Sequence, residues 1–273
     1  MFRRVAYLAV PAVVLASLAG CAGGLFNFER REAWRAEADK ACMSEQRAFR
    51  RDDGINEIRA IRDQGVCGLE RPLEITALAD GSVQIGPTAT INCPMTVALE
   101  RWIGESVQDA AVARLGVYVV GIDQMSDYSC RTKNSQPGAE LSEHAFGNAF
   151  DIGAFVLSDG RELTIKDHWT GGTQAEKDFL REILATSCQY FTTVLGPGSN
   201  IFHYDHFHFD LARHNADGTS HYCRPEINIP PRPETLPLLA DRPGLFGLAE
   251  PETAAPATPA AAEIEDLIQA LGM

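Results

Sequence analysis

Seven cysteines constrain the fold of this chain of 273 residues more than any other feature of its sequence. If disulfides form, an odd number leaves one thiol over, and that thiol needs a separate explanation. Six of the seven are spread through the body of the chain without any C-x-x-C pair: Cys42, Cys67, Cys93, Cys130, Cys188 and Cys223. Scattered cysteines are typical of disulfides in an exported protein and not of a thiolate metal site. The sequence therefore predicts three disulfides, and it singles out only Cys188 with Cys223, because these two flank the segment richest in histidine.

The seventh cysteine, Cys21, closes an N-terminal segment that has the three-part layout of a secretory signal. A short basic head precedes a mostly apolar stretch, which is too short to span a bilayer comfortably. The ending Leu-Ala-Gly-Cys at residues 18–21 resembles the lipobox of bacterial lipoproteins. The resemblance implies a signal peptide at residues 1–20, a lipidated Cys21 as the mature N-terminus, and a linker at residues 21–29. An uncleaved anchor or a plain secretory signal, with Cys21 present by chance, is the alternative.

Two features indicate the cellular location of the protein: the residue after Cys21 and the net charge. Ala22 stands where lipoproteins retained at the inner membrane often carry Asp, so the resemblance implies an outer-membrane lipoprotein in the periplasm of a Gram-negative bacterium. The chain has 24 Lys+Arg against 37 Asp+Glu, a net charge of -13. Phosphate backbones and anionic headgroups repel such a surface. We therefore expect no nucleic-acid partner, and membrane attachment through the acyl chains at Cys21 alone.

Hydrophobic periodicity predicts a mixed α+β domain. The expected helices cover residues 29–51, 94–115 and 174–190, and the expected strands cover residues 73–78, 82–85, 117–122, 148–157, 162–165 and 201–211. The first helix is expected to pack Trp34 and Cys42 inward, and Pro94 to occupy a first helical position.

The composition changes at Pro225, and nine of the fifteen prolines lie between Pro225 and Pro259. A segment this rich in Pro and Ala cannot bury a core of its own. We therefore expect one folded domain at residues 30–224, followed by a flexible Pro/Ala-rich tail at residues 225–273.

Three of the seven histidines fall within six residues, in the segment His-Tyr-Asp-His-Phe-His at positions 203–208. On a strand, His206 and His208 point to one face, whereas Asp205 and Phe207 point to the other. Two imidazoles therefore converge on one side of the sheet. Neutral imidazole is a common ligand of Zn²⁺, and a catalytic zinc site has three protein ligands and one open position.

A second segment supplies further ligands, in the pattern Ser142-x-His144-x-x-Gly147-x-Ala149-x-Asp151. His144 and Asp151 are too far apart in sequence for one helical or strand face to present both. Gly147 allows a sharp bend between them, and Ala149 leaves room for close packing. A histidine near a carboxylate is more often structural, but together with the histidine-rich segment the pattern predicts a metal site.

This pattern reproduces the S-x-H-x-x-G-x-A-x-D signature of the LAS zinc peptidases, which include D-Ala-D-Ala carboxypeptidases, murein endopeptidases and the Hedgehog domain. The segments at residues 128–131, 195–200 and 221–223 make the chain similar, over residues 40–224, to bacterial proteins with an extensin-like C-terminal domain. The resemblance implies an α+β fold whose small antiparallel sheet carries a zinc site and is flanked by helices. It also implies a zinc-dependent peptidase that cleaves peptidoglycan stem peptides or cross-links with a metal-activated water.

The resemblance implies that His144, Asp151 and His208 hold Zn²⁺. The murein endopeptidase pattern H-x-x-H-x-H places His203 and His206 beside the metal, with His206 as the base that polarises the attacking water. The carboxypeptidase branch has an acid three residues before its last histidine ligand, and Asp205 occupies that position. Strand alternation favours His206, but a bulge would turn Asp205 inward, so both assignments stay open.

Two further side chains have expected roles. Arg131 resembles the arginine that some LAS enzymes aim at a substrate carbonyl or carboxylate, for which a guanidinium offers two donors. Its alternative is a solvated loop position. Ser142 is expected to orient the site by hydrogen bonding. The alternative function is a non-catalytic, zinc-stabilised lipoprotein module that binds peptidoglycan or a protein partner.

Overall fold

The structure is a computed structural model that describes residues 31–45 and 54–232. The predicted signal peptide, the linker, the lipidation site Cys21 and most of the predicted tail lie outside the described residues. Within the described ranges, no helix combines the length and the apolar composition needed to cross a membrane.

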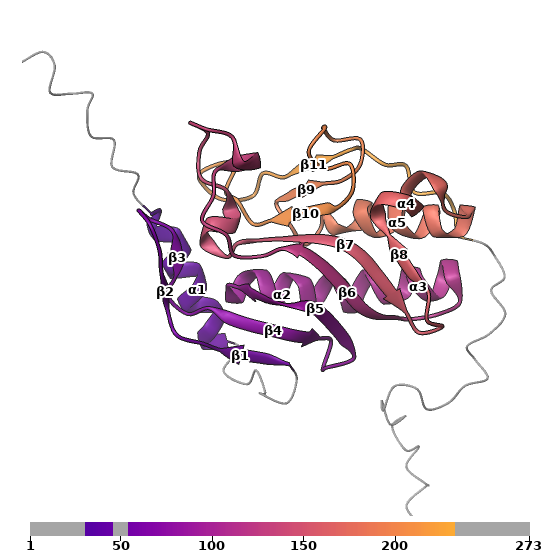
Figure 1. The fold of residues 1–273 in the computed structure, drawn as a ribbon, viewed down its shortest axis with the longest axis horizontal. Coiled ribbons are helices and arrows are strands. Elements are labelled where there is room, and N and C mark those ends of the chain that lie inside the picture. Colours follow the sequence, from indigo (N-terminus) through magenta and orange to yellow (C-terminus); the bar gives the residue numbers. More distant parts are fainter. Residues whose placement is uncertain (1–30, 46–53, 233–273) are drawn as a thin grey trace, which may run out of the picture. The chain divides into compact units, whose positions relative to one another are not determined.

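The chain has a mixed α+β arrangement in which runs of strands and runs of helices follow one another (Figure 1), and the sequence predicts this class. In chain order the elements are α1 (Ala33–Glu45), β1 (Ile55–Glu57), β2 (Ile61–Arg62), β3 (Gly68–Leu69), β4 (Leu73–Leu78), β5 (Val83–Ile91), α2 (Cys93–Trp102), the π-helix η2 (Ile103–Val107), α3 (Gln108–Leu115), β6 (Val119–Ser126), the short 3₁₀ helices η3 (Lys133–Ser135) and η4 (Glu143–Phe146), β7 (Ala149–Leu157), β8 (Glu162–Thr164), α4 (Ile165–Gly171), α5 (Gln174–Ser187), β9 (Thr193–Leu195), β10 (Phe207–Asp210) and β11 (Tyr222–Arg224).

The main sheet has nine strands in the order β1-β4-β5-β6-β7-β10-β9-β11, with β8 paired to β7. Most neighbours are antiparallel, but β5 pairs with β6 and β9 pairs with β11 in parallel. The β5–β6 connection runs through α2, η2 and α3, and a helical crossover of this kind allows parallel pairing. The sheet is therefore larger than the small antiparallel sheet that we expected, and it is mixed.

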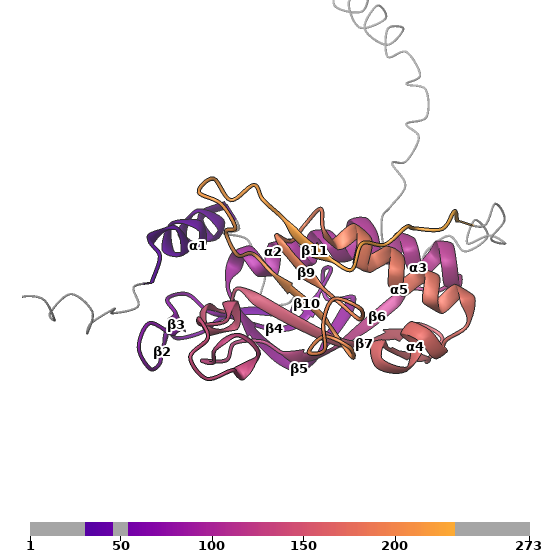
Figure 2. The same ribbon diagram turned by 90° about the horizontal axis from the view of Figure 1, so that it is seen from above.

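Helices α2, α3 and α5 lie along one face of the sheet (Figure 2). Trp102 at the end of α2 is fully buried and packs edge-on against Phe209 of β10, with ring centroids 5.0 Å apart. Its ring also contacts Phe155 of β7 and Phe191, and its Nε1–H donates to the carbonyl of Ile183 in α5 at 3.1 Å. Aromatic packing of this kind joins the helical layer to the central strands.

Local sequence signals account for several boundaries. The side chain of Asn92 accepts a hydrogen bond from the Met95 N–H at 2.8 Å, and Pro94 occupies the first turn of α2 as predicted. Thr173 and Glu176 form a reciprocal capping box at the start of α5. The expected hairpin is confirmed as β4 and β5, although β5 continues to Ile91.

Two further expectations, the length of one strand and the buried face of one helix, differ from the structure. The strand expected at residues 201–211 is limited to β10, and residues 201–206 form turns and bends instead. Asn200 caps this turn, because its side-chain oxygen accepts from the Phe202 N–H at 2.9 Å. The alternation of aromatic and polar residues alone therefore overestimates the length of the strand.

Helix α1 buries Arg35 and Met43, whereas Trp34 and Cys42, which we expected to pack inward, are only half-buried.

Three disulfides are present among the described residues, as the cysteine pattern predicts. They join Cys42 to Cys93, Cys67 to Cys130, and Cys188 to Cys223. The first ties α1 to α2, the second ties the β2–β3 hairpin to the loop after β6, and the third ties the end of α5 to β11. The only pair that the sequence singled out, Cys188 with Cys223, is confirmed.

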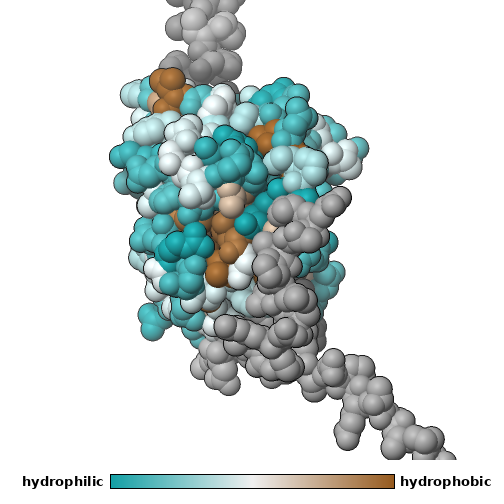
Figure 3. All heavy atoms as spheres, turned by 90° about the vertical axis from the view of Figure 1, so that its right-hand side faces the viewer, coloured by the Kyte–Doolittle hydropathy of each residue, from teal (hydrophilic) through white to brown (hydrophobic). Residues whose placement is uncertain are grey.

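The first residues of the predicted tail contact the domain. Arg114 of α3 donates to the carbonyls of Pro230 and Pro231 at 2.5 and 2.9 Å, and Arg232 forms an ion pair with Glu182 of α5 at 2.7 Å. Residues 230–232 therefore lie against α3 and α5. The end of the molecule that faces the viewer in Figure 3 is largely hydrophilic, with an apolar area near its centre and smaller ones above it.

Two glycines give a matched test of the fold. Gly147 has φ +61, and a Cβ there would lie 2.3 Å from Leu69 Cδ2, whereas a Cβ at Gly104 in η2 meets nothing within 4 Å. We expect Gly147→Ala to lower the free energy of unfolding by more than ~1 kcal/mol, and Gly104→Ala to leave it unchanged or raise it by up to ~1 kcal/mol. Urea unfolding of both variants measures the difference, and equal effects would contradict the assigned turn.

Candidate metal centre

Three buried side chains from separate elements bring potential metal ligands together. His144 comes from η4, Asp151 from β7 and His208 from β10. The His144 Nε2 atom lies 3.2 Å from Asp151 Oδ2 and 3.3 Å from His208 Nδ1, and His208 Nδ1 lies 2.7 Å from Asp151 Oδ1. One ligand atom from each residue lies within 4.8 Å of the others, so the three side chains point toward one position.

The donor set suits Zn²⁺. Ligands at zinc–ligand distances near 2.05 Å in a tetrahedron are separated from one another by about 3.3 Å. The contacts of His144 Nε2 with Asp151 and His208 are close to that separation. Two imidazole nitrogens and one carboxylate, with a fourth direction toward a cavity, match the ligand types of catalytic zinc sites.

Both imidazoles are oriented by partners on their far sides. The His144 Nδ1–H donates to the carbonyl oxygen of Asp127 at 2.6 Å, which leaves Nε2 free to act as a ligand. His208 Nε2 lies 3.0 Å from the carboxylate of Asp210, which leaves Nδ1 facing Asp151. Histidine ligands of metals usually have such second partners. Sequence reasoning missed Asp210, although its position two residues after His208 places it on the same face of β10.

The local structure of η4 presents His144 to the cluster. Ser142 is its N-terminal cap, and the Ser142 Oγ accepts from the His144 N–H at 3.4 Å. Gly147 ends the turn in a left-handed conformation, so the chain reverses into β7 and reaches Asp151. The bend expected at Gly147 is present, and Ser142 hydrogen-bonds the backbone of His144; its orienting role in the site stays a prediction.

Charges within the cluster and its partner Asp210 shift the pKa values of His208 and Asp151. Burial disfavours a charged His208, but the carboxylates of Asp151 and Asp210 outweigh burial and raise the pKa of His208 to about 10. Burial likewise opposes ionisation of Asp151, but the charges of His144 and His208 lower the pKa of Asp151 well below its usual range. Without metal, the cluster is therefore held as a buried ion pair.

A cavity of about 420 Å³ opens onto the three side chains. His203, His206 and Arg131 also line it. The rings of His203 and His208 have centroids 5.5 Å apart, and burial together with the charge of His208 lowers the pKa of His203 to about 4. His203 is therefore neutral and donates or accepts hydrogen bonds without adding charge to the cavity.

His206 and Asp205 form a pair. His206 Nδ1 lies 2.9 Å from Asp205 Oδ1. A carboxylate only accepts, so Nδ1 carries a proton, and the neutral form of the ring has its lone pair on the other nitrogen. His206 lines the cavity, whereas Asp205 is not among the residues that line it. The two alternatives for the base therefore occupy different positions, with Asp205 as the partner of His206.

Arg131 approaches the cluster from the loop after β6. Its Nη2 atom lies 3.6 Å from Asp151 Oδ2 and donates to Ser126 Oγ at 3.4 Å. The side chain is 28% exposed, so part of the guanidinium faces the cavity. His214, to which the sequence assigned no role in the site, also lines the cavity and contacts Thr193 Oγ1 at 2.9 Å.

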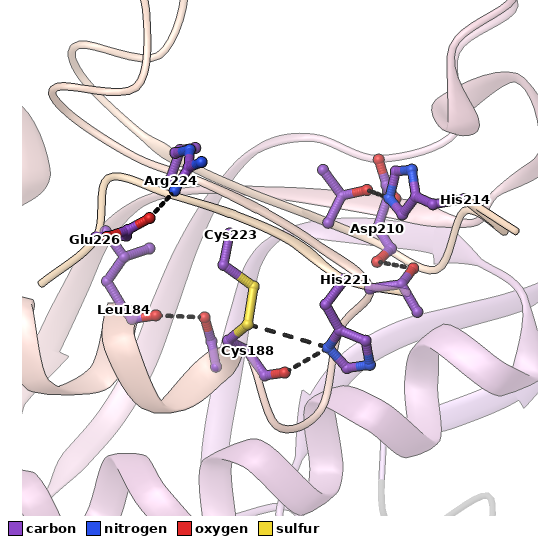
Figure 4. The surroundings of a disulfide bond; sticks show 11 residues. Leu184, Cys188, Asp210, His214, His221, Cys223, Arg224 and Glu226 are labelled. Carbon is purple, nitrogen blue, oxygen red and sulfur yellow. Dashed lines mark hydrogen bonds and ion pairs between the residues drawn. A yellow bond between two sulfur atoms is a disulfide. The ribbon is translucent and has the colours of Figure 1, made fainter. Parts of the chain in front are cut away.

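A second group with metal-ligand chemistry consists of Cys188, His221 and Cys223. Its two sulfur atoms are bonded to each other, and the His221 Nδ1–H donates to the carbonyl of Cys188 at 2.7 Å (Figure 4). Neither sulfur is a thiolate in this state, so the disulfide and the hydrogen bond account for the group without a metal.

The fold and the cluster define a class of protein: a mixed α+β domain with a buried pair of histidines and one carboxylate at the base of a cavity. The sequence model of the family described as "Extensin-like protein C-terminus" matches residues 40–224, which is more than half of the chain. The chain belongs to this family. No curated protein and no solved structure gives a significant match to it.

The pKa of His208 makes the stability of the metal-free protein depend on pH. The folded-state pKa of about 10 exceeds the ordinary value of 6.5. The stability contributed by His208 is therefore complete below about pH 6.5 and is lost as the pH rises toward 10. We expect the free energy of unfolding of the chelator-treated protein to decrease over this range, and His208→Gln to show a flatter dependence. Urea titrations at a series of pH values measure both, and parallel curves would contradict the assigned ion pair.

Proposed function

We propose that the protein is a zinc-dependent peptidoglycan peptidase related to the LAS enzymes, cutting stem peptides or their cross-links. The observation that carries the proposal is the convergence of His144, Asp151 and His208 beside a cavity that His206 also lines. When bound, Zn²⁺ would supply a Lewis acid that polarises a substrate carbonyl and makes a coordinated water acidic near neutral pH.

The side chains around the cavity have separate tasks in this reaction. Asp205 orients His206 and keeps the proton on Nδ1, so the other ring nitrogen can take a proton from the attacking water and return it to the leaving amine. This assignment favours His206 as the base and makes Asp205 its positioning partner. Arg131 would place a carbonyl or carboxylate of the substrate, because a guanidinium can donate two parallel hydrogen bonds.

We also propose that the protein is anchored to the outer membrane and faces the periplasm. A lipidated Cys21 would tether the protein to the outer membrane on its periplasmic side, where peptidoglycan is within reach. The net charge of -13 fits attachment by acyl chains and recognition through a local site, without a broad basic surface.

Zinc analysis and digestion of purified sacculi test the function. We expect about one zinc per chain, because three ligands converge at one position. We also expect muropeptides from the treated sacculi to lose cross-links or stem-peptide residues, with masses that identify the bond cut. Retained sacculus binding with zinc but without product would select the non-catalytic alternative. Absence of zinc, with no product, would reject the peptidase.

Variants of the paired residues test the assignment of the base. We expect His206→Ala to lower kcat by about 10²- to 10⁴-fold while zinc stays bound, since the variant removes proton transfer and no ligand. Asp205→Asn is expected to lower kcat less, because the base remains but loses its orienting carboxylate.

The matched control is His168→Ala, since His168 lies on α4 and contacts Thr164 outside the cavity. We expect it to leave kcat unchanged. A greater loss in Asp205→Asn than in His206→Ala would make Asp205 the base.

A further inference from the structure

Helix α1 contributes one side chain that reaches the metal-bearing turn. Arg35 pairs with Glu143 through both of its terminal nitrogens, with Nη1–Oε2 at 2.5 Å and Nη2–Oε1 at 2.7 Å. The side chains are 7% and 10% exposed, so the pair is largely withdrawn from water. A bidentate guanidinium–carboxylate pair fixes the direction as well as the distance of the carboxylate.

Glu143 is the first residue of η4 and immediately precedes His144. Its Oε2 atom also accepts from Asn148 Nδ2 at 2.6 Å, and the Asn148 side-chain oxygen accepts from Asn92 Nδ2 at 2.9 Å. The carboxylate of Glu143 therefore holds both ends of the bend between His144 and β7. Glu143 also lines the cavity, so the position of its charge affects the surroundings of the cluster.

The guanidinium of Arg35 is held in place by aromatic rings. It lies 4.1 Å from the centroid of the Phe146 ring, at the other end of η4, and 4.4 Å from that of Trp34. The disulfide between Cys42 and Cys93 fastens the same helix to α2. The matched family region begins at residue 40, so Arg35 lies outside it.

Loss of Arg35 would leave a buried carboxylate without its cation. Breaking such a pair on one side is costly, because the remaining charge is neither solvated nor compensated. Glu143 can escape this cost by turning toward the cavity, but it lies in the same short turn as His144. That movement would displace the His144 imidazole from its alignment with Asp151 and His208.

We propose that Arg35 is a positioning residue for the metal centre, acting through Glu143 on the turn that presents His144. The first half of α1 is thereby part of the site, although it precedes the matched family region. The proposal rests on the proposed zinc site. Zinc affinity would then depend on α1, a helix that contributes no residue to the lining of the cavity.

The test compares Arg35→Met with Arg114→Met in the full chain. Arg114 and Glu182 form another buried pair, with side chains 3% and 6% exposed, on α3 and α5 and away from the cavity lining. We expect Arg35→Met to weaken zinc binding by about 10- to 100-fold in a chelator competition, as loss of outer contacts does in other sites. It should also change the visible spectrum of the Co²⁺-substituted protein, whereas Arg114→Met should change neither.

A double variant separates positioning from loss of packing. In Arg35→Met/Glu143→Gln the buried charge is gone, so we expect zinc affinity to return to within about threefold of the unmodified protein. Zinc affinity and Co²⁺ spectrum unchanged in Arg35→Met, or equal losses in Arg35→Met and Arg114→Met, would overturn the proposal.

Amide hydrogen exchange in the metal-free chain keeps this result separate from the proposed function. We expect the amides of His144, Gly147 and Asn148 to exchange about tenfold faster in Arg35→Met than in Arg114→Met, because the bend loses its anchor. If the unmodified chain bound no zinc, the proposed function would fail. The exchange rates would then still decide whether Arg35 positions the turn, and equal rates would overturn that claim.

Discussion

The antiparallel pairing of β7 with β10 is the constraint on which the rest of the structure depends. In this register Asp151 lies directly opposite His208, and both side chains point away from the helical layer. Their neighbours alternate to the other face, where Phe150 and Phe209 are buried in the core. A shift of one residue would exchange the two sets and place a carboxylate and an imidazole in the aromatic core. Core packing therefore determines where the ligands meet.

The remaining parts of the site depend on short segments attached to this pair of strands. Turn η4 brings His144, the loop before β10 brings His206, and the loop after β6 brings Arg131. Each of these segments is fastened elsewhere, by a disulfide, by a capped turn or by a buried ion pair. Two candidate ligands on rigid strands and other groups on anchored loops suit the proposed zinc site, which would have to hold a metal firmly and admit a large substrate.

Several features were predictable because they depend on residues close in sequence. The spacing from Ser142 to Asp151 predicts the bend and the following strand, since only a residue tolerant of a left-handed conformation fits at Gly147. Other features were missed because they depend on contacts between distant segments. Arg35 and Glu143 are 108 positions apart, and no periodicity connects them. The strand expected at residues 201–206 is absent because Asn200 closes a turn there. Three residues of this segment, Phe202, His203 and His206, line the cavity from a turn and not from a pleated strand.

By itself, the sequence determined the mixed α+β class, the use of six cysteines in disulfides, and the two segments that carry the candidate ligands. These follow from local patterns of residue type, which act over a few positions. Tertiary structure alone decided the size and mixed direction of the sheet, two of the three disulfide pairings, the pairing of Asp205 with His206, the contact of Asp210 with His208, and the contact of Arg35 with Glu143. Those outcomes depend on which buried surfaces pack together and which buried charges find partners, and both are properties of the whole folded chain.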